Sequence, residues 1–310
     1  MKTSLLSILT GIFLFGISAC TKNGTDNNPG GGNPPITPGQ STVLAAIYAI
    51  DTTLAVPHDT IGRYNVTFDA LNRTSVITEL DTKPNGDSEY YLIQVFTYNG
   101  TDTNAIKRTE YTKTFSGTSG TINRDTSYYT FTNGKCVYDS NSHPTQYYVD
   151  KFGYAGNVVL RTGGSLGGGI KSTHQSSIYQ TFVNGNLTYQ IDTLVSHDVT
   201  NPNPAFFSYQ RMEITTSYIS NPNPFYQVVK NCLRPYNYDD LGITNATAPK
   251  VLIAQQHATL SIWGNGYSGN TIYDLAYTYT FRTDGYPVIA RQTFTTNGTT
   301  EKRKLYFVYQ

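Results

Sequence analysis

The sequence is poor in charge. Charged residues make up 14% of the 310 residues, whereas an ordinary soluble domain has about 25%. Without Lys2, which lies in an N-terminal leader, the basic and acidic residues are equal in number. A chain with no net positive charge offers no electrostatic footprint for a phosphate backbone, so we exclude nucleic acid as a partner.

Motifs for metals and redox chemistry are missing as well. The chain has 3 cysteines and 5 histidines, and it contains neither H-E-x-x-H nor Cys-x-x-Cys. No two histidines stand at the spacing of metal ligands. The five histidines are His58, His143, His174, His197 and His257. We therefore predict no metal site and no cofactor.

The only long apolar run lies at the N-terminus. In MKTSLLSILTGIFLFGISAC, one positive charge precedes an apolar stretch over residues 5–17, and small residues stand before Cys20. The stretch is too short for a spanning helix, and its three parts are typical of a secretory signal. We predict that residues 1–19 are a lipoprotein signal peptide and that Cys20, in a lipobox, becomes the lipidated N-terminus. The alternative is a plain secretory signal with an incidental cysteine.

The segment that follows Cys20 is a predicted tether. TKNGTDNNPGGGNPPITPGQ has almost nothing apolar to bury, so it cannot offset the entropy of ordering. Residues 20–40 would then hold a domain roughly 25 Å from the lipid. The remaining residues 41–310 are enough for a single large domain. The predicted location is the outer membrane, lipid-anchored, with the domain facing either the periplasm or the cell surface.

The domain itself has a period of two. Aromatic and β-branched residues alternate in runs such as EYYLIQVFTY, and 26 residues of the chain are tyrosine. Asparagine and glycine tolerate the positive φ angles of two-residue hairpin turns. Such runs end at Asn99-Gly100, Asn133-Gly134, Asn184-Gly185 and Asp284-Gly285. We expect an all-β fold, either a large curved antiparallel sheet or an open barrel, formed as a meander of a dozen or more strands.

One segment, NPNPFYQVVKNCLRP, has the period of a helix instead. Its apolar residues recur at helical spacing from Phe225 to Leu233, after Asn223 as a cap. We predict one short helix near 223–234 that plugs one end of the sheet or covers one face. It contains Cys232, which can form a disulfide with Cys136 outside the cytoplasm. The alternative is that Cys232 is only a small apolar residue on the helix face.

Four hexapeptides share a residue pattern. An aromatic or apolar residue comes first, aspartate usually follows it, and glycine or asparagine stands at the fifth position. They are FDALNR, VDKFGY, YDDLGI and FRTDGY, at residues 68–73, 149–154, 238–243 and 281–286. With the lipobox and tether, they make the chain resemble uncharacterised Bacteroidota envelope lipoproteins with Tyr-Asp-like β-repeats. The resemblance implies a porin-like or half-barrel sheet of unknown activity and supplies no catalytic residue. The chain departs from the pattern at Asn72, where glycine is usual, and at Arg282, where aspartate is usual.

Two patterns that suggest catalysis have simpler interpretations. Ser165 lies in a G-x-S-x-G sequence, but a nucleophile elbow needs a helix directly after the serine, and GGGIKST is a poor helix start. We interpret it as a glycine loop. Asp239-Asp240 is the only adjacent acidic pair, and we interpret both as turn residues. No catalytic residue is predicted.

Trp263 and Tyr267 are the candidate ligand-binding residues, since exposed aromatic rings stack on sugars; the alternative is that Trp263 belongs to the core.

Our first hypothesis is a non-enzymatic envelope lipoprotein that binds glycan, lipid or another envelope protein. The alternatives are a secreted hydrolase acting on polysaccharide or peptide, and a structural surface component. Carboxylates clustered in a concave pocket, or Ser165 near a histidine, would favour the hydrolase. An exposed Trp263 beside Tyr267 would favour glycan binding.

Overall fold

The computed structural model describes residues 42–52, 60–82, 88–116, 119–143, 146–167, 170–201, 203–229, 249–264 and 266–310. The strands are β1 (Leu44–Asp51), β2 (Thr60–Phe68), β3 (Thr74–Thr82), β4 (Ser88–Thr97), β5 (Lys107–Ser116), β6 (Ser119–Thr132), β7 (Lys135–His143), β8 (Gln146–Ala155), β9 (Val158–Gly167), β10 (Ile170–Val183), β11 (Asn186–Asp198), β12 (Ser208–Pro222), β13 (Val251–Gly264), β14 (Tyr267–Phe281), β15 (Pro287–Thr296) and β16 (Thr299–Tyr309). A 3₁₀ turn, η1 (Pro204–Phe206), and a helix, α2 (Phe225–Val229), complete the described elements.

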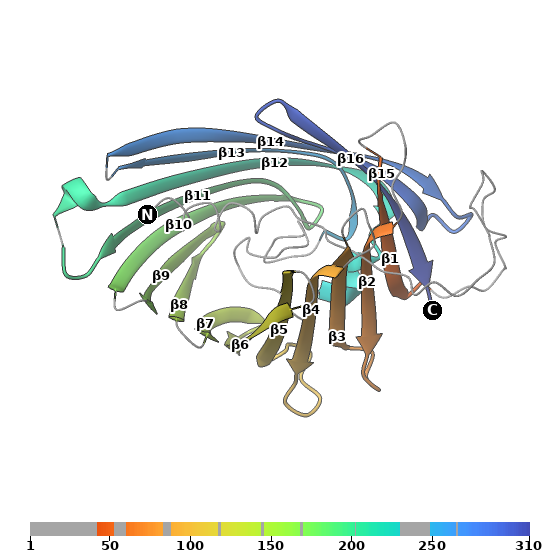
Figure 1. Cartoon of the computed structure of the whole chain (residues 1–310), viewed down its shortest axis with the longest axis horizontal. Coiled ribbons are helices and arrows are strands. Elements are labelled where there is room, and N and C mark those ends of the chain that lie inside the picture. Colours follow the sequence, from red (N-terminus) through yellow and green to blue (C-terminus); the bar gives the residue numbers. More distant parts are fainter. Residues whose placement is uncertain are drawn as a thin grey trace.

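The strands form a closed antiparallel barrel. Each pairs with its neighbours in sequence, and β1 pairs with β16 to close the sheet (Figure 1). The predicted all-β meander of more than a dozen strands is confirmed. Closure itself depends on a contact between the two ends of the domain, such as Ile47 opposite Phe307. The sequence pattern does not determine whether such a contact forms.

Local turn chemistry explains much of the meander. Asn133-Gly134, Asn184-Gly185 and Asn297-Gly298 all have positive φ at both residues, between 47° and 87°. This is the requirement of the type I′ turn, whose twist matches that of the flanking strands. The predicted turns at Asn133-Gly134 and Asn184-Gly185 are confirmed, and each of the three pairs joins two neighbouring strands.

Two of the four hexapeptides form the same longer turn. Asn72 (φ 57°) donates its backbone N–H to the carbonyl of Asp69 at 3.0 Å, and Gly285 (φ 86°) donates to that of Arg282 at 3.0 Å. Asparagine tolerates the left-handed region better than most residues. Asn72 therefore adopts the conformation for which glycine is usual.

The hexapeptide at residues 149–154 is different. It lies inside β8, and the turn that follows comes later, at Gly156 (φ 59°). It forms no hairpin turn itself, because its alternating residues extend the strand. The hexapeptide at residues 238–243 lies outside the described residues.

The wall of the barrel has two chemically different halves. From β12 through β16 to β3, buried apolar side chains face the interior, among them Leu260, Leu305 and Tyr64. Tyr277 and Tyr279 stack at 5.7 Å and pack against this core, as their shared strand face predicts. From β5 to β11, by contrast, the inward side chains include carboxylates, guanidinium groups and an imidazole.

Helix α2 packs against the apolar half from within. The ring of Phe225 lies 6.0 Å from that of Tyr64 and 6.4 Å from that of Phe307. The Thr74 hydroxyl donates to the carbonyl of Val228 at 2.6 Å. Asn223 accepts a hydrogen bond from the backbone N–H of Phe225 at 3.0 Å, the cap that the sequence predicts.

Residues 230–248 lie outside the described part of the chain, so the predicted extent of the helix to residue 234 stays a prediction. The same holds for the disulfide between Cys136 and Cys232. Cys136 is buried among Tyr129, Phe152 and neighbouring apolar side chains. Among the described residues, no helix is long and apolar enough to cross a membrane.

Candidate functional site

A pair of stacked aromatic rings lies on the outside of the barrel. Tyr209 of β12 and Trp263 of β13 are directly opposite in the strand pairing. Their ring centroids are 5.7 Å apart with an interplanar angle of 7°, and Trp263 is 42% exposed. Cross-strand aromatic pairs stabilise a sheet, but burial is what usually places tryptophan there. An exposed indole is therefore the informative observation.

The local backbone is shaped around this pair. Gly264 has φ 97°, and a Cβ at this position would lie 2.1 Å from the carbonyl oxygen of Phe207 and 3.0 Å from the ring of Tyr209. Only glycine permits that approach. The end of β13 can thus bend toward the segment that precedes β12.

More rings continue from the pair along the same end of the sheet. Phe207 lies 6.4 Å from Tyr209, and its ring stacks on the imidazole of His197 at 4.2 Å and 6°. We call His197, Phe207, Tyr209 and Trp263 the aromatic row. It crosses β11, β12 and β13 at their ends beside η1.

A row of polar side chains lies next to the aromatic row on the outer face. Arg211 is opposite Ser261, and Ser261 is opposite Asn270. Each is two residues along its strand from the level of Tyr209 and Trp263, so alternation places them on the same face. A guanidinium, a hydroxyl and an amide thus border the rings, and all three groups can hydrogen-bond to hydroxyl groups.

Tyr267 does not join Trp263. The register pairs Tyr267 with Gly264 and pairs Trp263 with Ser268, so the two aromatic residues lie on opposite faces of the β13–β14 hairpin. Consistently, a Cβ on Gly269 would meet the Tyr267 hydroxyl at 2.6 Å, and Gly269 is opposite the inward Ile262. The sequence pattern did not predict a role for Tyr209, because its contact with Trp263 depends on the pairing register of β12 and β13.

The aromatic row lies far from the point where the chain enters the barrel. In an antiparallel meander, odd-numbered strands all begin at one end, which is where β1 starts at Leu44. Trp263 lies at the finish of β13, at the other end. In Figure 1, β11 to β14 extend toward the left, and β1 lies on the right.

A second cluster lies inside the barrel, in its charged half. The Asp150 Oδ1 atom is 2.5 Å from His174 Nε2 and 3.1 Å from Arg161 Nε. All three side chains are largely buried. Burial opposes ionisation of Asp150, but the hydrogen bond from His174 and the charge of Arg161 outweigh it and hold the pKa of this carboxyl below its usual value.

Gly163 makes the contact between Asp150 and His174 possible. It lies on β9 between the two, opposite Asp150 on β8 and opposite His174 on β10. A Cβ here would be 2.3 Å from Asp150 Oδ1, 2.6 Å from His174 Nε2 and 2.2 Å from the carbonyl oxygen of Val149. The missing side chain leaves the space through which the pair meets. The glycine that suggested a nucleophile elbow has this packing role instead.

Asp192 of β11 is another buried acid beside this cluster. Burial raises the pKa of its carboxyl, although the Arg161 charge and the Ser176 hydroxyl oppose the shift. The folded state therefore binds the proton more tightly than the unfolded state, and the stability from this group is lost as the pH rises above the unfolded value.

We expect Asp192→Asn to raise the melting temperature at neutral pH, because the variant no longer has to keep a buried carboxylate ionised. The gain should shrink as the pH falls, because the wild-type carboxyl then takes up its proton. Thermal unfolding followed by circular dichroism at several pH values measures this. Asp198→Asn is the control, since Asp198 is exposed and its pKa is lowered by Thr200. A lower melting temperature for Asp192→Asn at neutral pH would contradict the assignment.

Ser165 is not positioned as a nucleophile. Its Oγ atom is 2.6 Å from Ser172 Oγ, and both residues continue regular strands. The carboxylates that do meet, Asp139 opposite Asp150, are buried in the wall. Asp239-Asp240 lies outside the described residues. Where the structure is described, no group of three or more histidine, cysteine, aspartate or glutamate residues is arranged to hold a metal ion.

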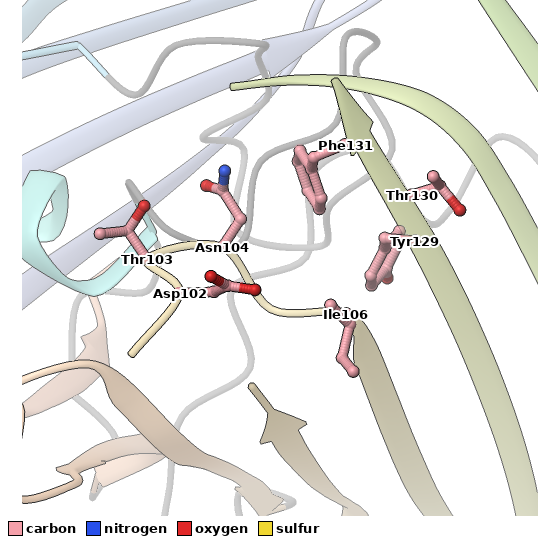
Figure 2. Close-up of a pocket in the computed structure, with 7 residues that line it drawn as sticks. All are labelled: Asp102, Thr103, Asn104, Ile106, Tyr129, Thr130 and Phe131. Atoms are coloured by element: carbon pink, nitrogen blue, oxygen red, sulfur yellow. The ribbon is translucent and has the colours of Figure 1, made fainter. Parts of the chain in front are cut away.

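A hollow of about 390 Å³ lies at the barrel end where β1 begins. Figure 2 shows Asp102 and Asn104, from the segment between β4 and β5, across from Tyr129 and Phe131 of β6. The segment is held by Arg73, which donates to the carbonyl of Asp102 at 2.7 Å. The volume suits a small ligand, and the lining mixes polar loop atoms with aromatic rings.

Two solved structures that resemble this chain are porin-like proteins. A porin-like protein from Bacteroides vulgatus ATCC 8482 has 11% identity and a TM-score of 0.41, over 86% of this chain and 99% of that one. A porin-like protein from Bacteroides uniformis ATCC 8492 has 10% identity and a TM-score of 0.34, over 87% of this chain and 99% of that one. No family model and no curated protein matches. The chain is thus similar to porin-like Bacteroides proteins, while the lipobox and the repeats remain predictions.

Proposed function

We propose that the protein is a lipid-anchored β-barrel of the cell envelope that binds glycan through its aromatic row. The observation that carries the proposal is the exposed Trp263 indole, stacked on Tyr209 and bordered by the polar row. Sugar rings have apolar C–H faces and a rim of hydroxyls. An aromatic surface beside hydrogen-bonding side chains complements both.

The position of the row supports this role. Cys20, as the anchor, would connect to the end of the barrel that contains Leu44. The aromatic row lies at the opposite end of the strands. A ligand site there would lie at the end of the barrel away from the anchor, accessible to glycan in the periplasm or outside the cell.

The outer surface of β12 to β14 supports a barrel that stands in water and does not span the bilayer. Arg211 and Glu213 form an ion pair at 3.0 Å, and His257 Nδ1 lies 2.7 Å from the Asp274 carboxylate, all with exposed side chains. A spanning barrel needs an outward apolar band about 25 Å tall, in which charges are strongly unfavourable. We therefore infer attachment through Cys20.

The interior supports binding on the outside in preference to passage or hydrolysis within. Ile178, Ser176 and Gln190 face inward, and water reaches almost none of their surface. These inward side chains are therefore covered at this level. Asp139 and Asp150 of the charged half are buried in the same wall, so neither carboxyl is exposed to a polysaccharide chain.

Affinity electrophoresis tests the proposal. Native gels that contain laminarin, xylan, mannan or dextran should retard the wild-type protein with at least one polysaccharide. We expect Trp263→Ala to weaken that retardation about tenfold or more, because a single stacking contact is then lost. Melting temperature should change little, since the indole is exposed.

The matched control is Tyr267→Ala. Tyr267 is an exposed aromatic on the same hairpin, but it lies on the opposite face. Its loss should leave retardation unchanged, whereas Tyr209→Ala should act like Trp263→Ala. Equal mobility of wild type and Trp263→Ala in every gel would overturn the proposal.

A further inference from the structure

The charged side chains of β5 to β10 are sorted by face. Every aspartate and glutamate in these strands points into the barrel: Glu110, Asp125, Asp139 and Asp150. Five basic side chains alternate with them and point outward: Lys107, Lys113, Arg124, Lys151 and Lys171. We call the outer surface of β5 to β10 the basic face. Its described side chains include no carboxylate.

The basic face also exposes large apolar and aromatic side chains. They include Ile122, Tyr128, Tyr147, Leu160, Leu166 and Tyr179, and each points outward by the pairing register. Basic groups lie over some of the rings: Lys107 Nζ is 5.6 Å from the centre of Tyr128, and the Arg124 guanidinium is 5.6 Å from that of Tyr111. On β12 to β14 the outer surface is mixed in charge instead, as in the pair Arg211 and Glu213.

We propose that the basic face docks on an anionic lipid surface. This rests on the anchored position proposed for the chain, because Cys20 would keep the barrel next to such a surface. Basic side chains attract acidic headgroups, their long stems lie along apolar surface, and tyrosine rings prefer the water–lipid boundary. The combination on one face matches the polar and apolar parts of that boundary.

The arrangement disfavours the other occupants. A second copy on a two-fold axis would bring the basic face against itself, and like charges would meet. The acidic side chains of the same strands face the interior of the barrel. Asp150 pairs with Arg161 and His174 within the wall, and no aspartate or glutamate of β5 to β10 shares the outer face with the cations.

The tether is long enough for this orientation. There are 24 residue steps between Cys20 and the first residue of β1, Leu44. Fully extended, they reach about 80 Å. The barrel can therefore lie with β5 to β10 against the lipid, although β1 enters on another part of the wall, and the aromatic row then remains at the free end of β11 to β13.

The test separates this face from the anchor. The mature chain with Cys20→Ser, which carries no lipid, is sedimented with vesicles of phosphatidylcholine alone or of phosphatidylcholine with phosphatidylglycerol. We expect binding only to the anionic vesicles, and loss of binding at high salt. Lys151→Gln combined with Lys171→Gln should weaken binding on the order of tenfold, since each cation near an anionic surface contributes severalfold.

Matched variants make the outcome decisive. Lys302→Gln with Lys304→Gln removes two outward cations from β16, outside the basic face, and should leave binding unchanged. Leu160→Ser with Leu166→Ser tests the apolar part and should also weaken binding. Because all these side chains are on the surface, equal melting temperatures establish folding. The proposal is overturned if the unlipidated chain does not bind anionic vesicles, or if the β16 variant loses as much binding as the basic-face variant. Glycan binding by the aromatic row is unaffected by either result.

Discussion

Replacing Asp150 with asparagine is expected to lower the free energy of unfolding at neutral pH by about 3–5 kcal/mol. The carboxylate is the shared partner of Arg161 and His174 in a buried wall, at 3.1 Å and 2.5 Å. Without it, the guanidinium keeps its charge but loses a partner for that charge. Chemical denaturation followed by circular dichroism measures the change, and the melting temperature should fall on the order of 10 °C.

The barrel contains its own control for this experiment. His257 and Asp274 make the same kind of contact at 2.7 Å, but on the exposed outer surface. Asp274→Asn should cost less than about 1 kcal/mol, as exposed ion pairs do. Similar losses for both variants would show that burial of the Asp150 cluster does not determine its importance.

The pH dependence of the Asp150 effect has a definite sign. The pKa of Asp150 is lowered in the folded state, so its contribution is present above the unfolded value and is lost as the pH falls through the folded value. The stability difference between wild type and Asp150→Asn should therefore narrow in acid. A difference that widens below pH 4 would contradict the lowered pKa.

Loss of the lipid anchor should move the protein completely from the detergent phase to the aqueous phase in detergent phase separation. In detergent phase separation, we expect the wild-type protein in the detergent phase, since two acyl chains suffice for stable anchoring. A chain that starts at Thr21, exported behind a conventional cleavable leader, should enter the aqueous phase. The separation is performed at high salt, so that the basic face does not contribute.

Labelling with a radioactive fatty acid completes the test of Cys20. The wild-type protein should incorporate the label, and Cys20→Ala should not. Label on the Cys20→Ala protein, or a Thr21 chain that stays in the detergent phase at high salt, would show that the protein is held by something other than lipid on Cys20.

The turns of this barrel were predictable because they are local. Asn133-Gly134 and Asn297-Gly298 need positive φ within two adjacent residues, and the residue types alone supply it. The same logic failed for residues 149–154, where a turn-like hexapeptide continues a strand. There the alternation of Tyr148, Asp150 and Phe152 on the inner face overrides the local pattern.

The sites were less predictable, because they depend on register between distant residues. Asp150 and His174 are 24 residues apart and meet only across Gly163. Tyr209 reaches Trp263 only once β12 and β13 are aligned. One signal was available: a two-residue turn that pairs Gly264 with Tyr267 necessarily pairs Trp263 with Ser268, which puts Trp263 and Tyr267 on opposite faces.

Tryptophan fluorescence tests the central claim most directly, because Trp263 is the only tryptophan in the chain. Titration with the polysaccharide that retards the protein should shift the emission to shorter wavelength and protect the indole from quenching by acrylamide. Both changes should saturate together, and Tyr209→Ala should weaken the affinity derived from them. Emission and quenching that stay unchanged while the polysaccharide is bound would place the glycan elsewhere and contradict the assignment of the aromatic row.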